Sequence, residues 1–286
     1  MRVSVIIPTA SRPQRLSRLI SQLRRQHLEG DMEIIVVDDA GDLDADILRA
    51  AGGQCEVCLM KGGRRGPACA RNAGALEATG QNLVFLDDDS EIDAGYLSRV
   101  LRELDCRPNH AVAGPQCAVD GAGSFALASA WLLDHFSRSQ RLDEEDYTFA
   151  PSNGLALRRS AFQGMDGFDI RFPLAAGEDR EFCERWVASG RRIAILSQLA
   201  VHHHFPSTAR AFWAQQWRYG RGAAFLSGRT RSAAHLRSTS FYARLLWSPV
   251  ENLGWQKGIR IALASAIAQV VVLLGFAYQR SLGAPC

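Results

Sequence analysis

Three consecutive carboxylates, Asp87, Asp88 and Asp89, directly follow the apolar run at 83–86. A buried strand that ends in three acids carries charge that must be neutralised, either by raised pKa values or by a cation. Oxygen ligands of this kind suit Mg²⁺ or Mn²⁺, which proteins usually hold with one or two carboxylates and the phosphates of a substrate. A solvated turn, with Asp89 or Ser90 capping the next helix, is the alternative that these residues leave open.

The elements that must position these acids alternate along the first ninety residues. Buried strands are predicted at 3–7, 33–37, 54–60 and 82–86, with helices at 13–26, 44–52 and from Pro67 to Gly80. Such alternation specifies a parallel sheet with helices on both faces, and ligands bind outside the carboxyl ends of its strands. The polar residues that follow these strands should therefore meet at one rim, and they are Thr9, Arg12, Asp38, Asp39 and the three acids.

A second candidate carboxylate, Asp179, lies in the segment GEDREFCERW, where a helix is expected to begin. The positive end of a helix dipole favours an ionised carboxylate, which is the state that a general base needs. Capping of the first helical turn by Glu178 and Asp179 is the simpler alternative. Further strands are predicted at 110–119 and 191–201, the second leading into three histidines, and helices at 93–105 and 124–139, with an acidic loop at 141–147.

Five segments in order, VSVIIPTASR, EIIVVDDAGD, GPACARNAG, LVFLDDDSEID and GEDREFCERW, resemble family 2 glycosyltransferases over about residues 3–204. The resemblance implies the GT-A fold, an α/β architecture with a mostly parallel central sheet. It further implies metal-dependent transfer of a sugar from a nucleotide sugar, usually a UDP-sugar, with inversion at the anomeric carbon. The acceptor would be a hydroxyl of a saccharide or of a lipid-linked molecule, in envelope polysaccharide or glycolipid synthesis.

The resemblance also implies roles for individual residues. The nucleotide sugar would be held by Thr9, Arg12, Asp39, Arg71, Asn72, Asp87 and Asp88, with Asp39 accepting from the uracil imide N–H. The metal would be held by Asp89 and Asp87, although Asp88 could replace either acid, and Asp179 would be the catalytic base. A histidine of the run 202–204 would reach the metal or the diphosphate, and we expect His202 or His204, which share one face of a strand.

The last 82 residues, 205–286, differ in charge from the rest of the chain. They contain ten Lys or Arg and one acid, whereas residues 1–204 carry a net charge of −6. Residues 261–279 are uncharged and just reach the roughly 20 residues that span a bilayer, so a helix that spans the membrane, lies in its interface or packs against the protein is compatible with this stretch. Basic tails contact nucleic acid or anionic lipid. We expect a membrane surface and no nucleic acid, with the protein cytoplasmic at the inner face of the cell membrane.

These observations predict a GT-A domain at 1–204, with a nucleotide-binding half at 1–109 and an acceptor half at 110–204, followed by a basic helical extension at 205–286. No GxGxxG follows the first strand and no P-loop is present, which disfavours dinucleotide and P-loop enzymes. A nucleotidyltransferase of similar fold is disfavoured because the loop PTASRPQR lacks glycines. An inactive membrane-associated binding protein is disfavoured because the acids are intact. Seven scattered cysteines argue against a disulfide framework.

Overall fold

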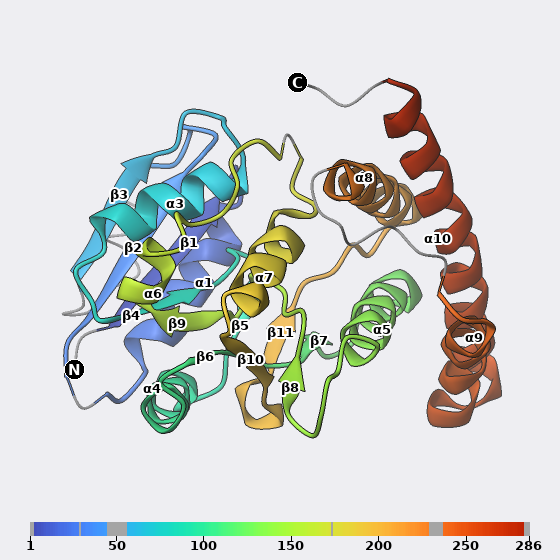
Figure 1. Ribbon diagram of the computed structural model, residues 1–286, viewed down its shortest axis with the longest axis horizontal. Coiled ribbons are helices and arrows are strands. Elements are labelled where there is room, and N and C mark those ends of the chain that lie inside the picture. The colour runs from blue at the N-terminus through green and yellow to red at the C-terminus, as the bar shows by residue number, and fades with distance from the viewer. Residues whose placement is uncertain (1–2, 29, 45–55, 173, 229–236, 283–286) are drawn as a thin grey trace.

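The computed structural model describes residues 3–28, 30–44, 56–172, 174–228 and 237–282 (Figure 1). An eight-stranded sheet lies at its centre. In sheet order the strands are β3 (Glu56–Lys61), β2 (Met32–Asp38), β1 (Val3–Thr9), β4 (Asn82–Phe85), β9 (Ala156–Arg158), β6 (His110–Ala113), β10 (Arg192–Ile195) and β8 (Asp146–Tyr147). The first four strands are parallel, β9 is antiparallel to both of its neighbours, and β10 is parallel to β6. The predicted mostly parallel sheet is therefore confirmed.

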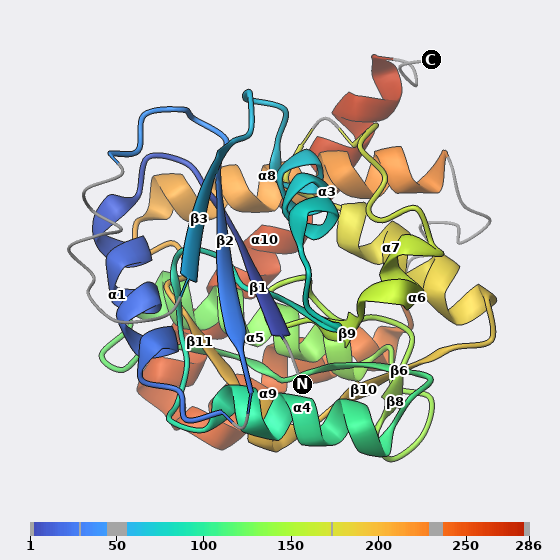
Figure 2. The same ribbon diagram turned by 90° about the vertical axis from the view of Figure 1, so that its left-hand side faces the viewer.

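Helices cover both faces of this sheet, because alternate residues of its buried strands point to opposite sides. Val5 and Ile7 of β1 belong to a core cluster with α1 (Pro13–Arg24) and α4 (Tyr96–Cys106). Ile6 belongs to the cluster on the other face, which packs against α3 (Pro67–Glu77), α6 (Arg159–Gln163) and α7 (Glu178–Ala188). Figure 2 shows α1 on one side of β1 and β2 and α3 on the other.

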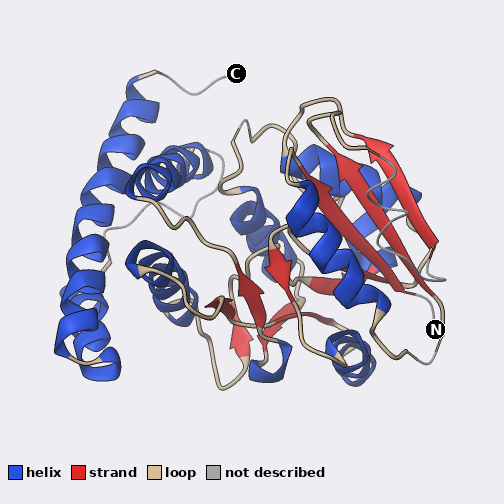
Figure 3. Cartoon of the chain, turned by 180° about the vertical axis from the view of Figure 1, so that it is seen from behind, coloured by secondary structure: helices blue, strands red, loops and turns tan. Residues whose placement is uncertain are grey.

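The remaining helices form a layer beside the sheet (Figure 3). They are α5 (Ser124–Arg138), α8 (Ala209–Ser227), α9 (Thr239–Leu253) and α10 (Trp255–Ser281). Two glycines allow α8 and α10 to cross closely. A Cβ at Gly220 would lie 2.1 Å from the carbonyl oxygen of Val272, and one at Gly275 would lie 2.5 Å from that of Trp217. The C-terminal region is thus helical, as predicted, and packs against the rest of the chain through α5 and α7.

A second, three-stranded sheet has the order β5 (Ser90–Glu91), β11 (Val201–His203), β7 (Gln116–Ala118). The strand predicted at 110–119 is divided between the two sheets, and so is the strand predicted at 191–201. The first division falls at Gly114 and Pro115, where proline cannot donate a ladder hydrogen bond. The predicted loop at 141–147 ends in β8, and the predicted helix at 44–52 lies outside the described residues except for Asp44.

The backbone at Gly114, where the first strand is divided, packs against Leu199, where the second is divided. This contact predicts the effect of a substitution on stability. A Cβ at Gly114 would lie 1.6 Å from the carbonyl oxygen of Leu199, so Gly114→Ala must separate two packed backbone segments. We expect a loss of unfolding free energy of about 1–3 kcal/mol, as for other overpacked sites, measured by urea denaturation. Gly164→Ala is the matched control, since φ is −66° there and its nearest neighbour lies 3.4 Å away. Equal stabilities for the two variants would contradict the prediction.

Candidate active site

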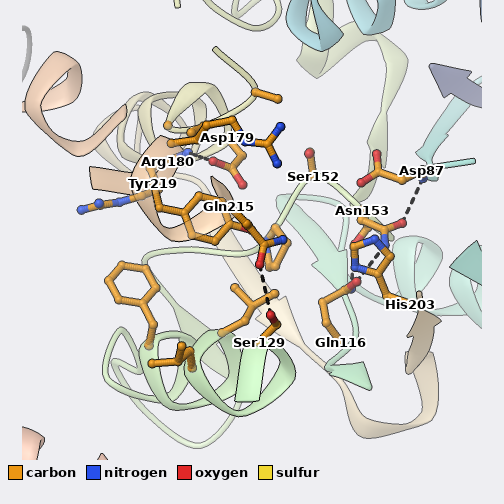
Figure 4. A pocket seen from close by; sticks show the side chains of 18 of the residues that line it. Asp87, Gln116, Ser129, Ser152, Asn153, Asp179, Arg180, His203, Gln215 and Tyr219 are labelled. Carbon is orange, nitrogen blue, oxygen red and sulfur yellow. Dashed lines mark hydrogen bonds between the residues drawn. The ribbon is translucent and has the colours of Figure 1, made fainter. Parts of the chain in front are cut away.

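A cavity of about 1400 Å³ lies at the carboxyl ends of the central strands, between the sheet and the helical layer (Figure 4). Residues that follow β1 and β4 line one side, together with the loop that precedes β9. The start of α7 and the facing surfaces of α5, α8, α9 and α10 line the other side. Figure 4 shows Asp179, Arg180 and Tyr219 on one side of this space and Asp87, Asn153 and His203 on the other.

The middle acid of the triple run, Asp88, is turned toward β1. Its carboxylate accepts a hydrogen bond of 2.7 Å from Thr9 Oγ1 and lies 3.0 Å from Arg12 Nη1. Burial raises the pKa of Asp88, although Thr9 and Arg12 act in the opposite direction. Asp88 therefore joins the ends of β1 and β4, and the two acids that flank it are left to face the cavity.

Asp87, Asp89 and His203 each offer one ligand atom, and these atoms all lie within 4.8 Å of one another. His203 Nε2 is 2.8 Å from Asp89 Oδ1, and Arg12 Nη1 is 2.6 Å from Asp89 Oδ2. Burial acts to raise the pKa of Asp89, but the hydrogen bond and charge of His203 and the charge of Arg12 outweigh it and lower this pKa. The same contact raises the pKa of His203 against the effect of its burial.

The histidine beside the acids is thus His203, and the prediction of His202 or His204 is corrected. The alternation of faces along β11 was expected, but the sequence does not indicate which face is turned toward the acids. The ladder pairs His203 with Ser90, next to Asp89. His204 also lines the cavity, with its Nε2 2.7 Å from Glu91 Oε1.

An amide pair holds the acidic loop in place. Asn153 Oδ1 accepts from the backbone N–H of Asp87 at 3.0 Å and from Ser90 Oγ at 2.8 Å. Asn153 Nδ2 donates to Gln116 Oε1, and Gln116 Nε2 donates to the Asn153 carbonyl, both at 2.8 Å. Gly154 follows at φ +81°, where a Cβ would meet Val201 at 2.8 Å. Gln116 was not foreseen, because nothing around it distinguishes it from another strand residue.

Arg71 connects the two sides of the site. Its buried guanidinium lies 2.7 Å from Asp87 Oδ1 and 3.2 Å from Glu178 Oε1. The next residue, Asn72, was predicted to line the nucleotide pocket, and the structure corrects this. Its amide donates to the Phe168 carbonyl at 2.7 Å and accepts from the Phe168 N–H at 2.9 Å, outside the cavity wall. Neighbouring helical residues point about 100° apart, so only one of the two reaches the cavity.

Asp39 lies in the cavity wall at the end of β2. Its carboxylate accepts from the backbone N–H groups of Arg65 at 2.9 Å and Gly66 at 2.8 Å. A carboxylate has about four lone-pair sites, so these two bonds leave capacity for a further donor. The recognition of a uracil N–H by Asp39 stays a prediction.

Glu178 and Asp179 open α7. Burial raises the pKa of Glu178 to about 7, and the neighbouring charge of Asp179 adds to the effect. Burial also raises the pKa of Asp179, opposed by the Arg180 N–H and by Arg71. The loop before them approaches α8 closely, since a Cβ at Gly222 would lie 2.4 Å from the Ala176 carbonyl. Packing of α8 therefore places this acid pair at the cavity.

The sequence model of Glycosyl transferase family 2 matches residues 4–165. The pre-mycofactocin glycosyltransferase of Mycobacterium tuberculosis is 30% identical over 234 residues, which are 79% of this chain and 48% of that protein. The GalNAc(5)-diNAcBac-PP-undecaprenol beta-1,3-glucosyltransferase of Campylobacter jejuni is 26% identical over 157 residues, covering 54% of this chain and 49% of that protein. The chain spans about half the length of these relatives.

Two solved structures share the fold. The mannosyltransferase PcManGT of Pyrobaculum calidifontis, in complex with GDP-Man and Mn²⁺, has a TM-score of 0.60 and 18% identity, covering 99% of this chain and 76% of that one. Staphylococcus aureus TarS 1–349 in complex with UDP has a TM-score of 0.59 and 17% identity, covering 99% and 91%. The expected GT-A architecture is confirmed. Because the family model covers more than half of its length, this chain belongs to glycosyl transferase family 2.

Proposed function

We propose that this chain is a metal-dependent, inverting glycosyltransferase. It moves a sugar from a nucleotide sugar, a UDP-sugar, to a hydroxyl of a saccharide or lipid-linked acceptor in envelope polysaccharide or glycolipid synthesis. The observation that carries the proposal is the arrangement of the cavity, with Asp87, Asp89 and His203 on one side and Asp179 on the other. The complexes of fold neighbours with GDP-Man and Mn²⁺ and with UDP support the class of donor and cofactor.

The donor set fits Mg²⁺ or Mn²⁺. Two carboxylate oxygens and one imidazole nitrogen within 4.8 Å of one another suit these ions, and the remaining positions suit phosphate oxygens. When bound, the ion supplies positive charge to the leaving diphosphate. Arg12 and Arg15, which lie 2.6 and 3.3 Å from Asp89 Oδ2, balance the charge of the acids from the β1 side. Thr9 and Arg12 border the space left for the nucleoside.

The chain's own residues carry the proton transfer. Asp179 accepts the proton of the acceptor hydroxyl. At the same time the oxygen of that hydroxyl bonds to the anomeric carbon, and the bond from that carbon to the diphosphate breaks. Arg71 holds Asp87 on the donor side and Glu178 next to the base. These two ion pairs fix the position of the base relative to the donor site. Attack from the side opposite the leaving group inverts the anomeric centre.

The proposal is tested by incubating the protein with a panel of nucleotide sugars and Mn²⁺ and measuring the nucleotide released. We expect one UDP-sugar to be hydrolysed slowly and faster than the others, and the release to stop with EDTA. Release of pyrophosphate from a nucleoside triphosphate and a sugar phosphate would instead identify a nucleotidyltransferase. No release from any donor, with or without a wide range of acceptors, would overturn the proposal.

The acid pair at the start of α7 predicts a pH effect. A base with a raised pKa loses activity as pH falls through that raised value. The charge of Asp179 raises the pKa of Glu178, and because the repulsion between two like charges is mutual, Glu178→Gln should lower the pKa of Asp179. We expect the acid limb of the kcat/KM profile to move to lower pH in this variant. An acid limb that stays in place, or moves to higher pH, would show that the pair does not control it.

Membrane association at the cytoplasmic face is part of the proposal. Among the described residues, α10 is the one helix long and apolar enough to cross a membrane, and only 28% of its most apolar part is buried. Its outer face exposes large apolar side chains such as Leu263 and Leu274, and Trp255 is 65% exposed. Lys257 and Arg260 lie between Trp255 and Leu263, and their positive charges suit an anionic lipid surface.

This association predicts that the protein co-sediments with anionic lipid vesicles. Leu263→Ser combined with Leu274→Ser should weaken that binding, because each change removes exposed apolar area without altering the packed face of α10. Sedimentation with vesicles, compared with sedimentation alone at low salt, measures the effect. A wild-type protein that remains wholly in the soluble fraction at low salt would contradict membrane association.

A further inference from the structure

The cavity extends beyond Asp179 into a space walled by α5, α8 and α9, called here the acceptor wing. The apolar wall of this wing is formed by Leu132 and Phe136 of α5 and by Phe241 and Leu245 of α9. Polar side chains at its floor include Ser129 and Gln215, which are hydrogen-bonded to each other at 3.1 Å. The metal-ligand cluster lies on the opposite side of the cavity (Figure 4). A donor bound at the metal-ligand cluster would therefore leave the acceptor wing free for the acceptor.

Two arginines lie against the same aromatic ring in the acceptor wing. The Arg180 guanidinium is 5.0 Å from the centroid of Phe136, and the Arg237 guanidinium is 5.4 Å from it. Arg237 is also 6.0 Å from the centroid of Phe241. In the part of the chain that the structure describes, neither guanidinium forms an ion pair with a carboxylate. When the amide oxygen of Gln140 is oriented toward Arg237, it accepts hydrogen bonds from that guanidinium, and Gln140 itself carries no charge.

The two guanidinium groups repel each other, and the nearest carboxylate charges acting on Arg180, those of Asp179 and Glu184, form no ion pair with it. Burial lowers the pKa of Arg180, and the like charge of Arg237 adds to that effect, while Asp179 and Glu184 oppose it. Because two like charges in a partly buried site repel, an anion that contacts both guanidinium groups would lower the free energy of the arrangement.

We propose that the acceptor wing binds an acceptor that carries a phosphate group, with its oxygens held by Arg180 and Arg237 and an apolar part against Phe136, Phe241 and Leu245. This inference rests on the proposed function, since it names the acceptor class of that same site. Guanidinium groups suit phosphate because their planar fork donates two parallel hydrogen bonds. Arg180 directly follows Asp179, so a phosphate held there keeps the acceptor beside the proposed base.

Binding of four small probes by isothermal titration calorimetry, without donor or metal, tests the inference. Geranyl phosphate carries both features, geraniol only the apolar one, glycerol phosphate only a phosphate ester, and inorganic phosphate only the anion. We expect geranyl phosphate to bind most tightly, and Arg237→Gln and Arg180→Gln each to weaken it by about tenfold or more. Arg237→Lys should retain part of the affinity, because it keeps the charge but not the fork.

Arg210→Gln is the matched control, since Arg210 is exposed on α8 and outside the cavity. It removes the same charge and should leave geranyl phosphate binding unchanged. Tight binding of glycerol phosphate would point to a soluble phosphate ester, and its absence beside strong geranyl phosphate binding would point to a lipid phosphate. The inference is overturned if neither arginine variant weakens binding, or if Arg210→Gln weakens it equally. Since no donor is present, these outcomes are independent of whether sugar transfer occurs.

Discussion

Asp179→Asn is expected to lower kcat for sugar transfer by about 10²–10⁴-fold, the range that a positioned general base contributes. Asparagine keeps the size and the hydrogen bond from the Arg180 N–H to Oδ1, so the start of α7 should be preserved. It cannot take a proton from the acceptor hydroxyl. Because Asp179 lies across the cavity from Asp87 and His203 (Figure 4), UDP affinity should remain close to that of the wild type.

The measurement pairs a nucleotide-release assay in the presence of acceptor with calorimetric titration of UDP and Mn²⁺. Unchanged UDP binding with lost turnover would assign Asp179 to chemistry alone. Near-full turnover in Asp179→Asn would remove Asp179 as the base. Loss of both turnover and UDP binding would show that the carboxylate maintains the whole cavity rather than serving the acceptor.

Asp89→Ala is expected to abolish the Mn²⁺-dependent part of UDP binding. Asp89 contributes one of the three ligand atoms, and it also holds His203 through the 2.8 Å contact to Nε2. Its removal therefore loses one ligand and releases a second. UDP affinity with Mn²⁺ should fall to the value measured with EDTA, as read by calorimetry.

Asp88→Asn provides the comparison within the same triple run. Its carboxylate is engaged by Thr9 and Arg12 on the β1 side, so Mn²⁺ should still strengthen UDP binding in this variant. If Asp88→Asn lost the metal effect and Asp89→Ala kept it, the ligand would be Asp88. That result would contradict Asp87, Asp89 and His203 as the metal ligands.

The first half of the fold was predictable because its signals are local. Runs such as those of β1 and β2 are apolar and β-branched over their whole length, which indicates strands buried on both faces. The second half was harder, because the residues on both sides of Gly114 and Pro115 have one apolar character, and this Gly-Pro pair marks a break without showing that the two pieces join different sheets. Division of a run between two sheets depends on packing against Leu199, a contact that is remote in sequence.

The site was predictable to the level of segments, and less so to the level of side chains. The acids 87–89 and Asp179 were placed at a cavity, as expected from strand ends and a helix start. The choice of His203 depends on which face of β11 meets Ser90, and the position of Asn72 depends on how α3 is rotated against Phe168. Neither rotation leaves a signal in a single sequence.

The stereochemistry of transfer distinguishes single displacement from double displacement. In the proposed mechanism the base and the leaving diphosphate lie on opposite sides of the sugar, and transfer is a single displacement. With an α-linked UDP-sugar and an acceptor that supports turnover, proton NMR of the fresh product should show a β linkage. A product with the α linkage of the donor would contradict single displacement assisted by Asp179.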